Sequence, residues 1–425
     1  MLGINLVRDH PDVILADLNK REDTEKVKYI KKVQEIDEAY RSLLHEAQRL
    51  RQKRNTISRE IAQLKKAGKD ASALLKEAAD IPQRIQEIEI EQNQLKQKID
   101  YYLMRLPNIL HESVPVGKDD TENQLIEKVG KKPSYTFDLK SHVDILNDLN
   151  LVDLERAAKI SGARFWFLKN EALMLDFALQ KYALDFMVQK GFSVVQPPFM
   201  MNKKAYEGVT DLKDFEDVMY KIADEDLYLI ATSEHPLTAM YTDEILEAKD
   251  LPLTVCGIST NFRKEAGAHG KDQKGIFRGH QFNKIEQIVI CDPADSWKFH
   301  EQILGFAKDF FASLGLHFRV VAICTGDIGT VAAKKYDIEV WYPVQNAYRE
   351  VVSCSNCTDY QARRLKIRVR GKEKNSFVHT LNSTLVATSR AVAAILENNQ
   401  QKDGSVKIPD VLVPYMNGLK VIKHK

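Results

Sequence analysis

The 425-residue sequence has few cysteines, little net charge and no long apolar run. None of its apolar stretches approaches the roughly 20 residues of a membrane-spanning helix, so we expect no membrane anchor. A net charge of +2 excludes a chain that coats nucleic acid through its overall charge. The cysteines form no regular framework, which favours a reduced, cytoplasmic protein; they are Cys256, Cys291, Cys324, Cys354 and Cys357.

Common nucleotide-binding and nucleophile motifs are also missing. The chain has neither a GxxxxGKS/T loop nor a GxGxxG segment after a strand, so any ATP would be held by another scheme. No Ser or Cys lies in a nucleophile elbow. Cys354 and Cys357 form a lone CxxC pair, and the two further ligands that a zinc site needs are not nearby. We therefore expect buried or surface thiols and no structural zinc.

Residues 24–106 contain no Trp or Phe and only one glycine, Gly68. Apolar residues recur there at alternating spacings of four and three on both sides of Gly68, as in Ile36, Tyr40, Leu43, Ala47 and Leu50, and in Leu74, Ala78, Ile81, Ile85 and Ile88. This heptad pattern predicts an antiparallel coiled-coil hairpin of two helices of about 40 residues each. Pro82 should kink or restart the second helix, with Asp80 as a candidate N-cap.

Between residues 49 and 69 the hairpin carries eight basic residues and a single acid, Glu60. Such a run is often only the solvated face of a coiled coil. The imbalance is nevertheless large for a nearly neutral chain, and a narrow basic rod suits the phosphate backbone of a folded RNA. The candidate RNA-contacting residues are Arg49, Arg51, Lys53, Arg54, Arg59, Lys65 and Lys66.

Residues 107–160 are punctuated by prolines and polar residues, as in a connector. From about residue 165 the composition becomes globular, and we expect an apolar helix over 171–190. We expect strands over 192–196, 227–231, 253–262, 281–290, 317–323, 338–342 and 348–352, and helices over 234–249, 295–313 and 386–399. Several strands follow one another without a helix, which predicts an α+β protein with a mixed or antiparallel sheet.

Two of these strands flank the most informative segment. Phe262-Arg263-Lys264-Glu265 ends the first, and Phe282-Asn283-Lys284-Ile285-Glu286 begins the second. Arg263 and Glu265 should share one strand face, as should Phe282 and Glu286. The loop between them contains Gly267, Gly270, Gly275 and Gly279 together with Lys271, Lys274 and Arg278. Such a hairpin can bind phosphates, stack on a base and hold an ammonium group, although Phe282 in the core and Glu286 in a salt bridge are alternatives.

Three other segments carry polar residues with a chemical use. Glu350 and Ser353 supply hard oxygen ligands suited to Mg²⁺. Arg390 lies on an otherwise apolar, alanine-rich helix, where burial without an anion is costly. Thr232-Ser233-Glu234 ends an apolar strand, and capping the next helix is its simplest alternative role.

Taken together, these segments resemble the class II aminoacyl-tRNA synthetases, and more closely the seryl-tRNA synthetase family, over nearly the whole chain. The matching segments are 1–8 with the helical arm, 232–234, 262–267, 280–286, 353–357 and 382–390. Many bacterial members have Asn-Gly-Ser-Gly where this chain has Asn382-Ser383-Thr384-Leu385, so a threonine hydroxyl replaces a serine hydroxyl. The form of this segment and the presence of Cys357 resemble archaeal or eukaryotic members more than bacterial ones.

The resemblance implies a six- or seven-stranded antiparallel catalytic sheet flanked by helices, an N-terminal coiled-coil arm and a homodimer. It implies a tRNA-binding domain over 1–110, a connector over 111–160 and a catalytic domain over 161–425, with Gln196-Pro197-Pro198 at the dimer interface. The implied reaction is activation of L-serine with ATP to seryl-adenylate. The seryl group would then pass to the 3′ end of tRNA(Ser), and of tRNA(Sec) where that is present.

The resemblance also implies residue roles. Arg263 and Arg390 would be the catalytic residues, on the α- and γ-phosphates. Glu265 would bind the adenine amino group, Phe282 would stack on adenine, and Glu350 and Ser353 would hold Mg²⁺. The other ATP-contacting residues would be Lys264, Gly279, His280, Gln281, Val351 and Val352. The serine site would comprise Thr232, Glu234, Arg263, Glu286, Asn382 and Thr384, with Glu286 on the ammonium group.

Two other interpretations compete with this one. A synthetase-derived RNA-binding protein without catalysis would have no need to retain a complete set of polar site residues, from Arg263 to Arg390. A purely structural coiled-coil protein would not need the globular half with its charged hairpin. The sequence therefore favours an enzyme.

Overall fold

A computed structural model describes residues 1–211, 217–265 and 274–424 of the chain. The chain divides into two compact units, Met1–Pro107 and Asn108–Lys425. The first unit is helical, and the second contains the large sheet. Within the described ranges, none of the helices combines the length and the apolar character needed to cross a membrane.

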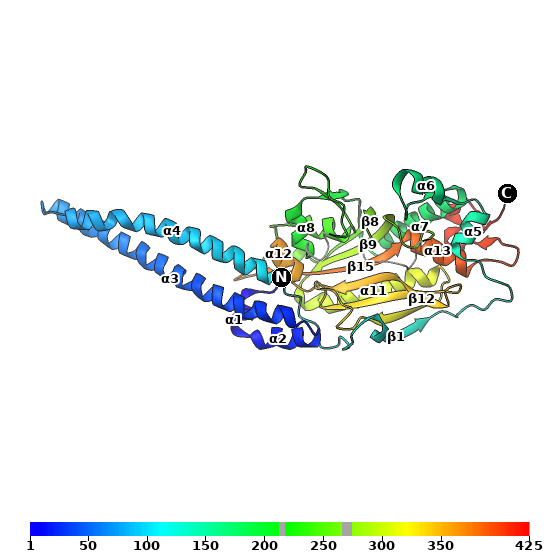
Figure 1. Cartoon of the computed structure of the whole chain (residues 1–425), viewed down its shortest axis with the longest axis horizontal. Coiled ribbons are helices and arrows are strands. Elements are labelled where there is room, and N and C mark those ends of the chain that lie inside the picture. Colours follow the sequence, from blue (N-terminus) through cyan, green and yellow to red (C-terminus); the bar gives the residue numbers. More distant parts are fainter. Residues whose placement is uncertain (212–216, 266–273, 425) are drawn as a thin grey trace. The chain divides into compact units, whose positions relative to one another are not determined.

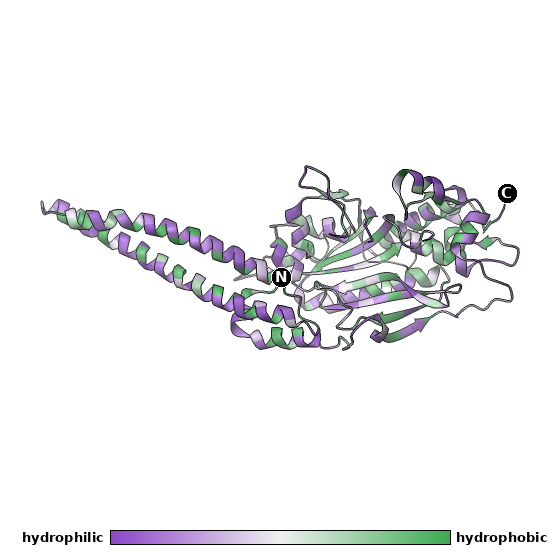
Figure 2. Cartoon of the chain, viewed as in Figure 1, coloured by the Kyte–Doolittle hydropathy of each residue, from purple (hydrophilic) through white to green (hydrophobic). Residues whose placement is uncertain are grey.

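The first unit is a long helical hairpin on a short helical base (Figure 1). Helices α1 (Ile4–Asp9) and α2 (Pro11–Lys20) form the base, and α3 (Thr24–Lys66) and α4 (Ser72–Leu103) lie side by side. Ile57, Ile81 and Ile85 are buried between the two long helices. Figure 2 shows hydrophobic and hydrophilic residues alternating along both. The predicted helix pair and its turn at Gly68 are confirmed.

Of the two effects predicted for Pro82, a kink or a restart of the helix, the restart with Asp80 as N-cap is wrong. Helix α4 begins at Ser72 and runs without a break to Leu103, with Pro82 inside it. Asp70, rather than Asp80, accepts a hydrogen bond from the backbone nitrogen of Ser72 at 2.9 Å. A proline removes one hydrogen bond from a helix, and the burial of Ile81 and Ile85 against α3 offsets that loss.

The second unit is built on an eight-stranded sheet with the order β1-β10-β11-β12-β15-β9-β8-β4. All neighbouring strands are antiparallel except β4 and β8, which are parallel. In chain order the strands are β1 (Gln124–Val129), β4 (Ser193–Val195), β8 (Leu253–Phe262), β9 (Gln281–Cys291), β10 (Phe318–Ala322), β11 (Lys334–Tyr342), β12 (Ala347–Asn356) and β15 (His379–Ala387).

This sheet corrects two expectations. It has eight strands and one parallel pair, where a six- or seven-stranded antiparallel sheet was expected. One added strand, β1, comes from the segment interpreted as a connector, and β15 comes from a segment that no strand pattern marked. Neither strand has a clear alternation of polar and apolar residues in its sequence. Strand β1 is short and mostly exposed, and β15 has polar and apolar residues on two buried faces.

Helices cover the two faces of the sheet differently. Helices α7 (Asn170–Gln189), α11 (Ser296–Ser313) and α13 (Thr388–Asn398) pack on one face and form the main hydrophobic core with it. On the other face, α10 (Glu234–Ala239) packs on β8 and β9 and α12 (Tyr360–Leu365) packs on β15, while α8 (Lys203–Val209) packs against both of these helices. The second face is therefore only partly covered, and the polar pocket opens there.

The remaining elements are short. The helix predicted over 234–249 ends at Ala239, since Asp243 adopts a positive φ of 63° and a strand follows. The other short elements are α5 (His142–Asp148), α6 (Leu154–Ser161), β2 (Val152–Asp153), β3 (Phe167–Leu168), β5 (Met200–Met201), β6 (Tyr228–Leu229), β7 (Ile245–Leu246), β13 (Arg368–Val369), β14 (Ser376–Phe377), β16 (Val406–Lys407) and β17 (Val421–Ile422).

Candidate active site

A pocket of about 380 Å³ lies on the partly covered face of the sheet. It brings together most of the residues that the sequence singled out, from segments far apart in the chain. Those that line it are Thr232, Glu234, Arg263, Glu265, Gly279, Phe282, Glu286, Glu350, Val351, Ser353, Asn382, Thr384 and Arg390. The pocket is therefore the candidate active site.

Four residues assigned to ATP do not line this pocket. Val352 is buried in the main core, and Gln281 lines a separate cavity of about 220 Å³. The backbone nitrogen of Lys264 donates to Val218, and a ring nitrogen of His280 lies 2.7 Å from the hydroxyl of Tyr220. Within the loop, Gly267, Gly270 and Lys271 lie outside the described residues.

Strand β9 presents its polar residues to the pocket by simple alternation. Phe282, Lys284 and Glu286 line the pocket, while Ile285 faces the main core. Arg263 and Glu265 reach the same pocket in another way, because β8 already ends at Phe262. The Nε of Arg263 donates to the carbonyl of Ala231 at 3.1 Å, and Glu265 adopts a positive φ of 51°.

Two irregularities in strand pairing set the other side of the pocket. Glu350 and Ser353 are three residues apart, so a regular strand would point them to opposite faces. The register between β11 and β12 shifts between Ile338 and Glu339, where Val351 is the extra residue, and both side chains line the pocket. Thr384 lies directly opposite Glu286, and a second shift, between β15 and β9, follows this pair with Leu385 as the extra residue.

Two carboxylates meet at the inner end of the pocket. The hydroxyl of Thr384 donates to Glu286 at 3.2 Å, and the Nζ of Lys284 lies 2.5 Å from the same carboxylate. The amide of Gln361 donates to Glu234 at 3.1 Å. Burial, together with the negative charge of Glu286, raises the pKa of Glu234 to about 7. An ammonium group bound here would stabilise both carboxylates in their charged form.

Cations occupy the outer end. Burial lowers the pKa of Arg263 from its ordinary value, although Glu265 opposes this shift. Arg390 donates to the backbone carbonyl of Glu350 at 2.8 Å, and its guanidinium lies 5.1 Å from the ring centre of Phe277. Burial would raise the pKa of Glu350, but the charges of Arg390, Lys335 and Arg263 outweigh it and lower that pKa. This end is therefore suited to phosphates and a divalent cation.

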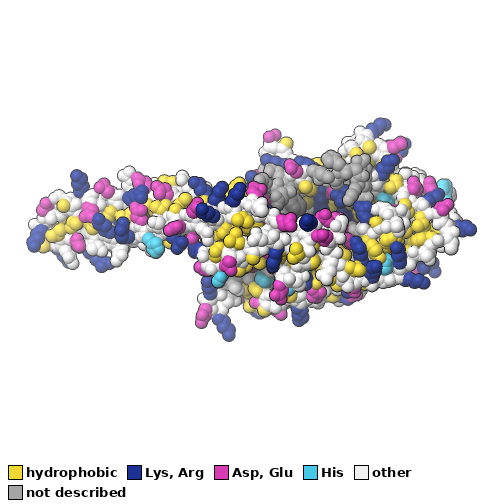
Figure 3. Space-filling view, turned by 60° about the horizontal axis from the view of Figure 1, so that its bottom comes forward, with side chains coloured by type: hydrophobic (Ala, Val, Ile, Leu, Met, Phe, Trp, Pro, Cys, Tyr) yellow, Lys and Arg dark blue, Asp and Glu magenta, His cyan; other side chains and the backbone are white. Residues whose placement is uncertain are grey.

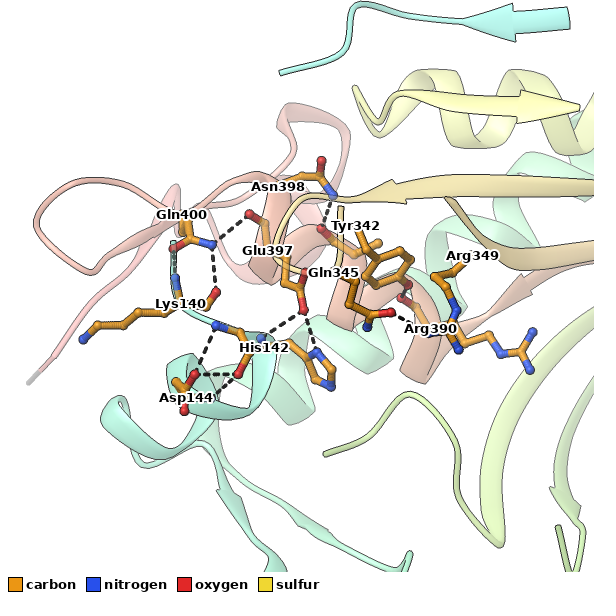
Figure 4. A network of polar contacts seen from close by, with 12 residues as sticks. Lys140, His142, Asp144, Tyr342, Gln345, Arg349, Arg390, Glu397, Asn398 and Gln400 are labelled. Atoms are coloured by element: carbon orange, nitrogen blue, oxygen red, sulfur yellow. Dashed lines mark hydrogen bonds and ion pairs between the residues drawn. The ribbon is translucent and has the colours of Figure 1, made fainter. Parts of the chain in front are cut away.

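The helix that carries Arg390 is held at both ends. The hydroxyl of Tyr342 donates to the backbone carbonyl of Arg390 at 2.7 Å. At the far end of α13, Glu397 accepts a hydrogen bond from the backbone nitrogen of His142 at 3.2 Å and lies 2.8 Å from its ring nitrogen. Figure 4 shows these contacts joining the chain around His142 to α13. They anchor α13, the helix that carries Arg390.

Several lining residues were not among the predicted site residues. They are His235, Phe277, Arg278, Lys284, Lys335, Ala387 and Ser389. Arg278 forms an ion pair with Glu265 at 2.9 Å. Alternation on β9 gave a signal for Lys284, whereas nothing in the local sequence distinguishes Lys335. Gly279 has a packing role as well, since a Cβ there would lie 2.1 Å from the ring of Trp166.

All seven basic residues proposed to contact RNA lie exposed on the arm. Two of them form ion pairs with acidic residues of α4: Arg51 lies 2.8 Å from Glu89, and Lys53 pairs with Glu77. Figure 3 shows basic and acidic side chains interspersed along this unit. The positive charge available to a ligand is therefore greatest nearer the turn, at Arg54, Arg59 and Lys65.

Two family models match the chain. The seryl-tRNA synthetase N-terminal domain matches residues 1–110, and the tRNA synthetase class II core domain (G, H, P, S and T) matches residues 219–399. The second match covers six of the eight strands of the sheet and every residue that lines the pocket. Fold and site thus define a class II aminoacyl-tRNA synthetase.

Individual relatives narrow this class. The serine–tRNA ligase of Methanocella arvoryzae is 59% identical over 99% of this chain and 100% of its own. The structure of seryl-tRNA synthetase from Pyrococcus horikoshii, complexed with ATP, has a TM-score of 0.95 and 50% identity, covering 100% of both chains. A serine–tRNA ligase from Naegleria fowleri, in complex with AMP, has a TM-score of 0.90 and 36% identity, covering 100% of this chain and 99% of that one. The chain belongs to the seryl-tRNA synthetase family and is a ligase.

The pKa of Glu234 leads to a test of the pocket's electrostatics. Because this pKa is raised from 4.5 to about 7, folding takes up a proton between these pH values, and stability falls as pH rises through this window. The substitution Glu234→Gln removes the ionisable group and therefore removes this decrease of stability with pH. We expect the ligand-free variant to unfold like the wild type near pH 5 and to be more stable at pH 8, by at most on the order of 3 kcal/mol.

Thermal unfolding of the wild type and of Glu234→Gln between pH 5 and pH 8 measures the difference in stability. Glu225→Gln, at an exposed acid, is the control, and a difference independent of pH would contradict the assignment.

Proposed function

We propose that this enzyme activates L-serine with ATP to seryl-adenylate and transfers the seryl group to the 3′ end of tRNA(Ser), in the cytoplasm. One observation carries the proposal: a single pocket holds two carboxylates, Glu234 and Glu286, together with two arginines, Arg263 and Arg390. The ammonium group of an amino acid would pair with the carboxylates, and the phosphates of a triphosphate would pair with the arginines. The ATP complex of the Pyrococcus relative and the AMP complex of the Naegleria relative support the same reaction.

The inner end fits serine. Glu286 is the proposed partner of the ammonium group, because its carboxylate is buried and already oriented by Thr384. Glu234 and Thr384 are the proposed partners of the serine hydroxyl, with Thr232 and Asn382 completing the wall. A site that hydrogen-bonds a hydroxyl rejects alanine strongly, since its buried polar groups would stay unpaired.

The outer end fits ATP. Arg263 is the proposed contact of the α-phosphate and Arg390 that of the γ-phosphate, while Phe282 stacks on adenine and Glu265 accepts from its amino group. The Arg263 guanidinium lies 5.3 Å from the centre of the Phe282 ring, so one hairpin can serve the base and the phosphate together. Arg278, held by Glu265, adds a positive charge within reach of the phosphates.

Glu350 and Ser353 would hold Mg²⁺, which would neutralise phosphate charge. They fit this role because both oxygen-bearing side chains line the pocket. Within the described ranges, no three His, Cys, Asp or Glu side chains lie close enough together to form a metal site. A divalent ion here would therefore take further oxygen ligands from ATP and water.

The proposed chemistry needs alignment rather than a protein nucleophile. The serine carboxylate attacks the α-phosphorus, the bond to the bridging oxygen breaks, and pyrophosphate leaves. The 3′-terminal hydroxyl of tRNA then attacks the carbonyl carbon of the seryl-adenylate and releases AMP. Arg263 and Arg390 stabilise charge that develops on phosphate oxygens, and the buried pocket strengthens this effect.

A serine-dependent ATP–pyrophosphate exchange assay tests the first half-reaction. We expect exchange with the wild type, with serine strongly preferred over alanine and threonine. Arg263→Ala should lower the rate by roughly two to three orders of magnitude, because it removes a fixed electrostatic group. Lys249→Ala, at an exposed position that does not line the pocket, should stay near the wild-type rate. Absence of serine-dependent exchange would contradict the function, and a wild-type rate for Arg263→Ala would contradict that role.

We propose that the enzyme is a homodimer that associates through α7 and the neighbouring edge strand. Apolar side chains are exposed along this surface: Leu173, Met174, Phe177, Val188 and Val194, each 38–55% exposed. Exposed apolar residues on one face of a helix beside an open strand edge are typical of an isologous interface.

A charge in the centre of this surface should dissociate the dimer. We expect Phe177→Asp to sediment as a folded monomer at concentrations where the wild type is a dimer, because burying a carboxylate between the subunits is unfavourable. The control is Val116→Asp, which changes an apolar residue that is 75% exposed elsewhere. A variant Phe177→Asp that remained dimeric would contradict this interface.

We propose that residues 1–110 are the tRNA-binding domain and that its arm contacts the phosphate backbone of tRNA(Ser). Exposed arginines and lysines near the turn support this role. An arm that recognises the shape of a tRNA more than its sequence would also accept tRNA(Sec) where that tRNA is present.

A shortened arm separates the two half-reactions. Replacing residues 46–87 with the native turn 67–71 removes the proposed RNA contacts but keeps Asp37, which accepts hydrogen bonds from Arg8 and Arg41 at the base. We expect pyrophosphate exchange to remain near the wild-type rate and charging of tRNA to fall at least tenfold, because phosphate contacts dominate such affinity. Restoring the arm with its basic residues near the turn changed to glutamine should not rescue charging. Equal losses of exchange and charging would contradict this division.

A further inference from the structure

Asp337 lies beside the proposed magnesium ligands but belongs to a different strand. It is on β11, and its Cα is paired directly with that of Ser353 on β12. Its chain neighbours Tyr336 and Ile338 face the main core, so Asp337 points to the face where the pocket opens. The strand register thus brings the Asp337 carboxylate next to Ser353, whereas Glu339, which is paired with Glu350, is held by Arg319.

The Asp337 side chain is buried and only half satisfied. The residue is 6% exposed, and its Oδ2 lies 3.5 Å from the Nζ of Lys335. Among the described residues, Oδ1 has no hydrogen-bond partner. A buried oxygen left without a partner costs about 1–3 kcal/mol, so its retention next to a ligand pocket points to a partner that arrives with the ligand.

We propose that Asp337 is a positioning residue for the magnesium ion, accepting a hydrogen bond through Oδ1 from a water molecule bound to the ion. This inference rests on the proposed use of ATP. Magnesium keeps several of its waters in proteins, and these waters donate to nearby carboxylates. A contact through water also fits the absence, among the described side chains, of three acids close enough to bind one ion directly.

The surrounding charges agree with this role. Ser353 is neutral, so of the two proposed ligands Glu350 alone would bring a negative charge to a divalent ion. Lys335 lines the pocket and carries a positive charge beside Asp337, which limits the repulsion between the two carboxylates before the ion binds. The competing explanation is that Asp337 serves only to hold Lys335.

Manganese binding measured by electron paramagnetic resonance decides between these roles. The probe is Mn²⁺ with α,β-methylene-ATP, without serine or tRNA, on the full chain. We expect Asp337→Asn to raise the half-saturating Mn²⁺ concentration by about tenfold or more. Glu225→Gln should stay within about twofold, because Glu225 is exposed and does not line the pocket. The pyrophosphate exchange rate of Asp337→Asn should recover at high metal concentration.

Further variants keep the proposal falsifiable. Lys335→Met should bind Mn²⁺ at least as well as the wild type, since it removes a positive charge. An unchanged half-saturation for Asp337→Asn, or equal weakening by Asp337→Asn and Lys335→Met, would overturn the role of Asp337. If Asp337→Asn does not fold, Asp337→Ser is measured in the same way. Wild-type exchange with serine is assayed in parallel, so failure of the proposed function is recognised separately from failure of this inference.

Discussion

The register of β15 is the constraint on which the site depends. This strand lies between β12 and β9, and its pairing sets Thr384 opposite Glu286 and Asn382 opposite Ser355. It then leads directly into α13, which carries Arg390. A slip of one residue would turn the polar side chains of β15 into the core. The same strand therefore connects the carboxylate end of the pocket with its cationic end.

The pocket holds charges of both signs close together before any ligand is bound. The raised pKa of Glu234 and the lowered pKa of Arg263 show that burial acts against the charged forms of both side chains. Each pKa shift means that keeping the charged side chain in the ligand-free folded state lowers the free energy of unfolding. A zwitterionic amino acid and a polyphosphate would relieve both effects, because each brings the opposite charge to the matching end. The electrostatic arrangement therefore favours binding the two substrates together.

Much of this protein follows from local sequence patterns. The heptads predicted α3 and α4, and the strand expected over 253–262 has these bounds in the structure. Alternation on β9 correctly placed Phe282 and Glu286 on one face. Such features depend on residue spacing alone, which a sequence displays directly.

Other features depend on contacts between distant segments. The bulge at Val351 and the positive φ of Glu265 have no local pattern, and β1 became visible only through its pairing with β10. Lys335 and Asp337 were missed for the same reason, since their relevance comes from the neighbouring strand. Most of the residues that line the pocket could thus be singled out from the sequence, but its complete membership could not.

The two register shifts also set a limit on how this sequence can diverge. Val351 and Leu385 each add one residue that the partner strand does not match. Deleting either would straighten its strand and exchange inward for outward side chains on one side of the deletion. Substitutions at these positions do not change which side chains face inward and which face outward along the strand. Length, rather than residue identity, is therefore the property that descendants of this chain must conserve at these two points.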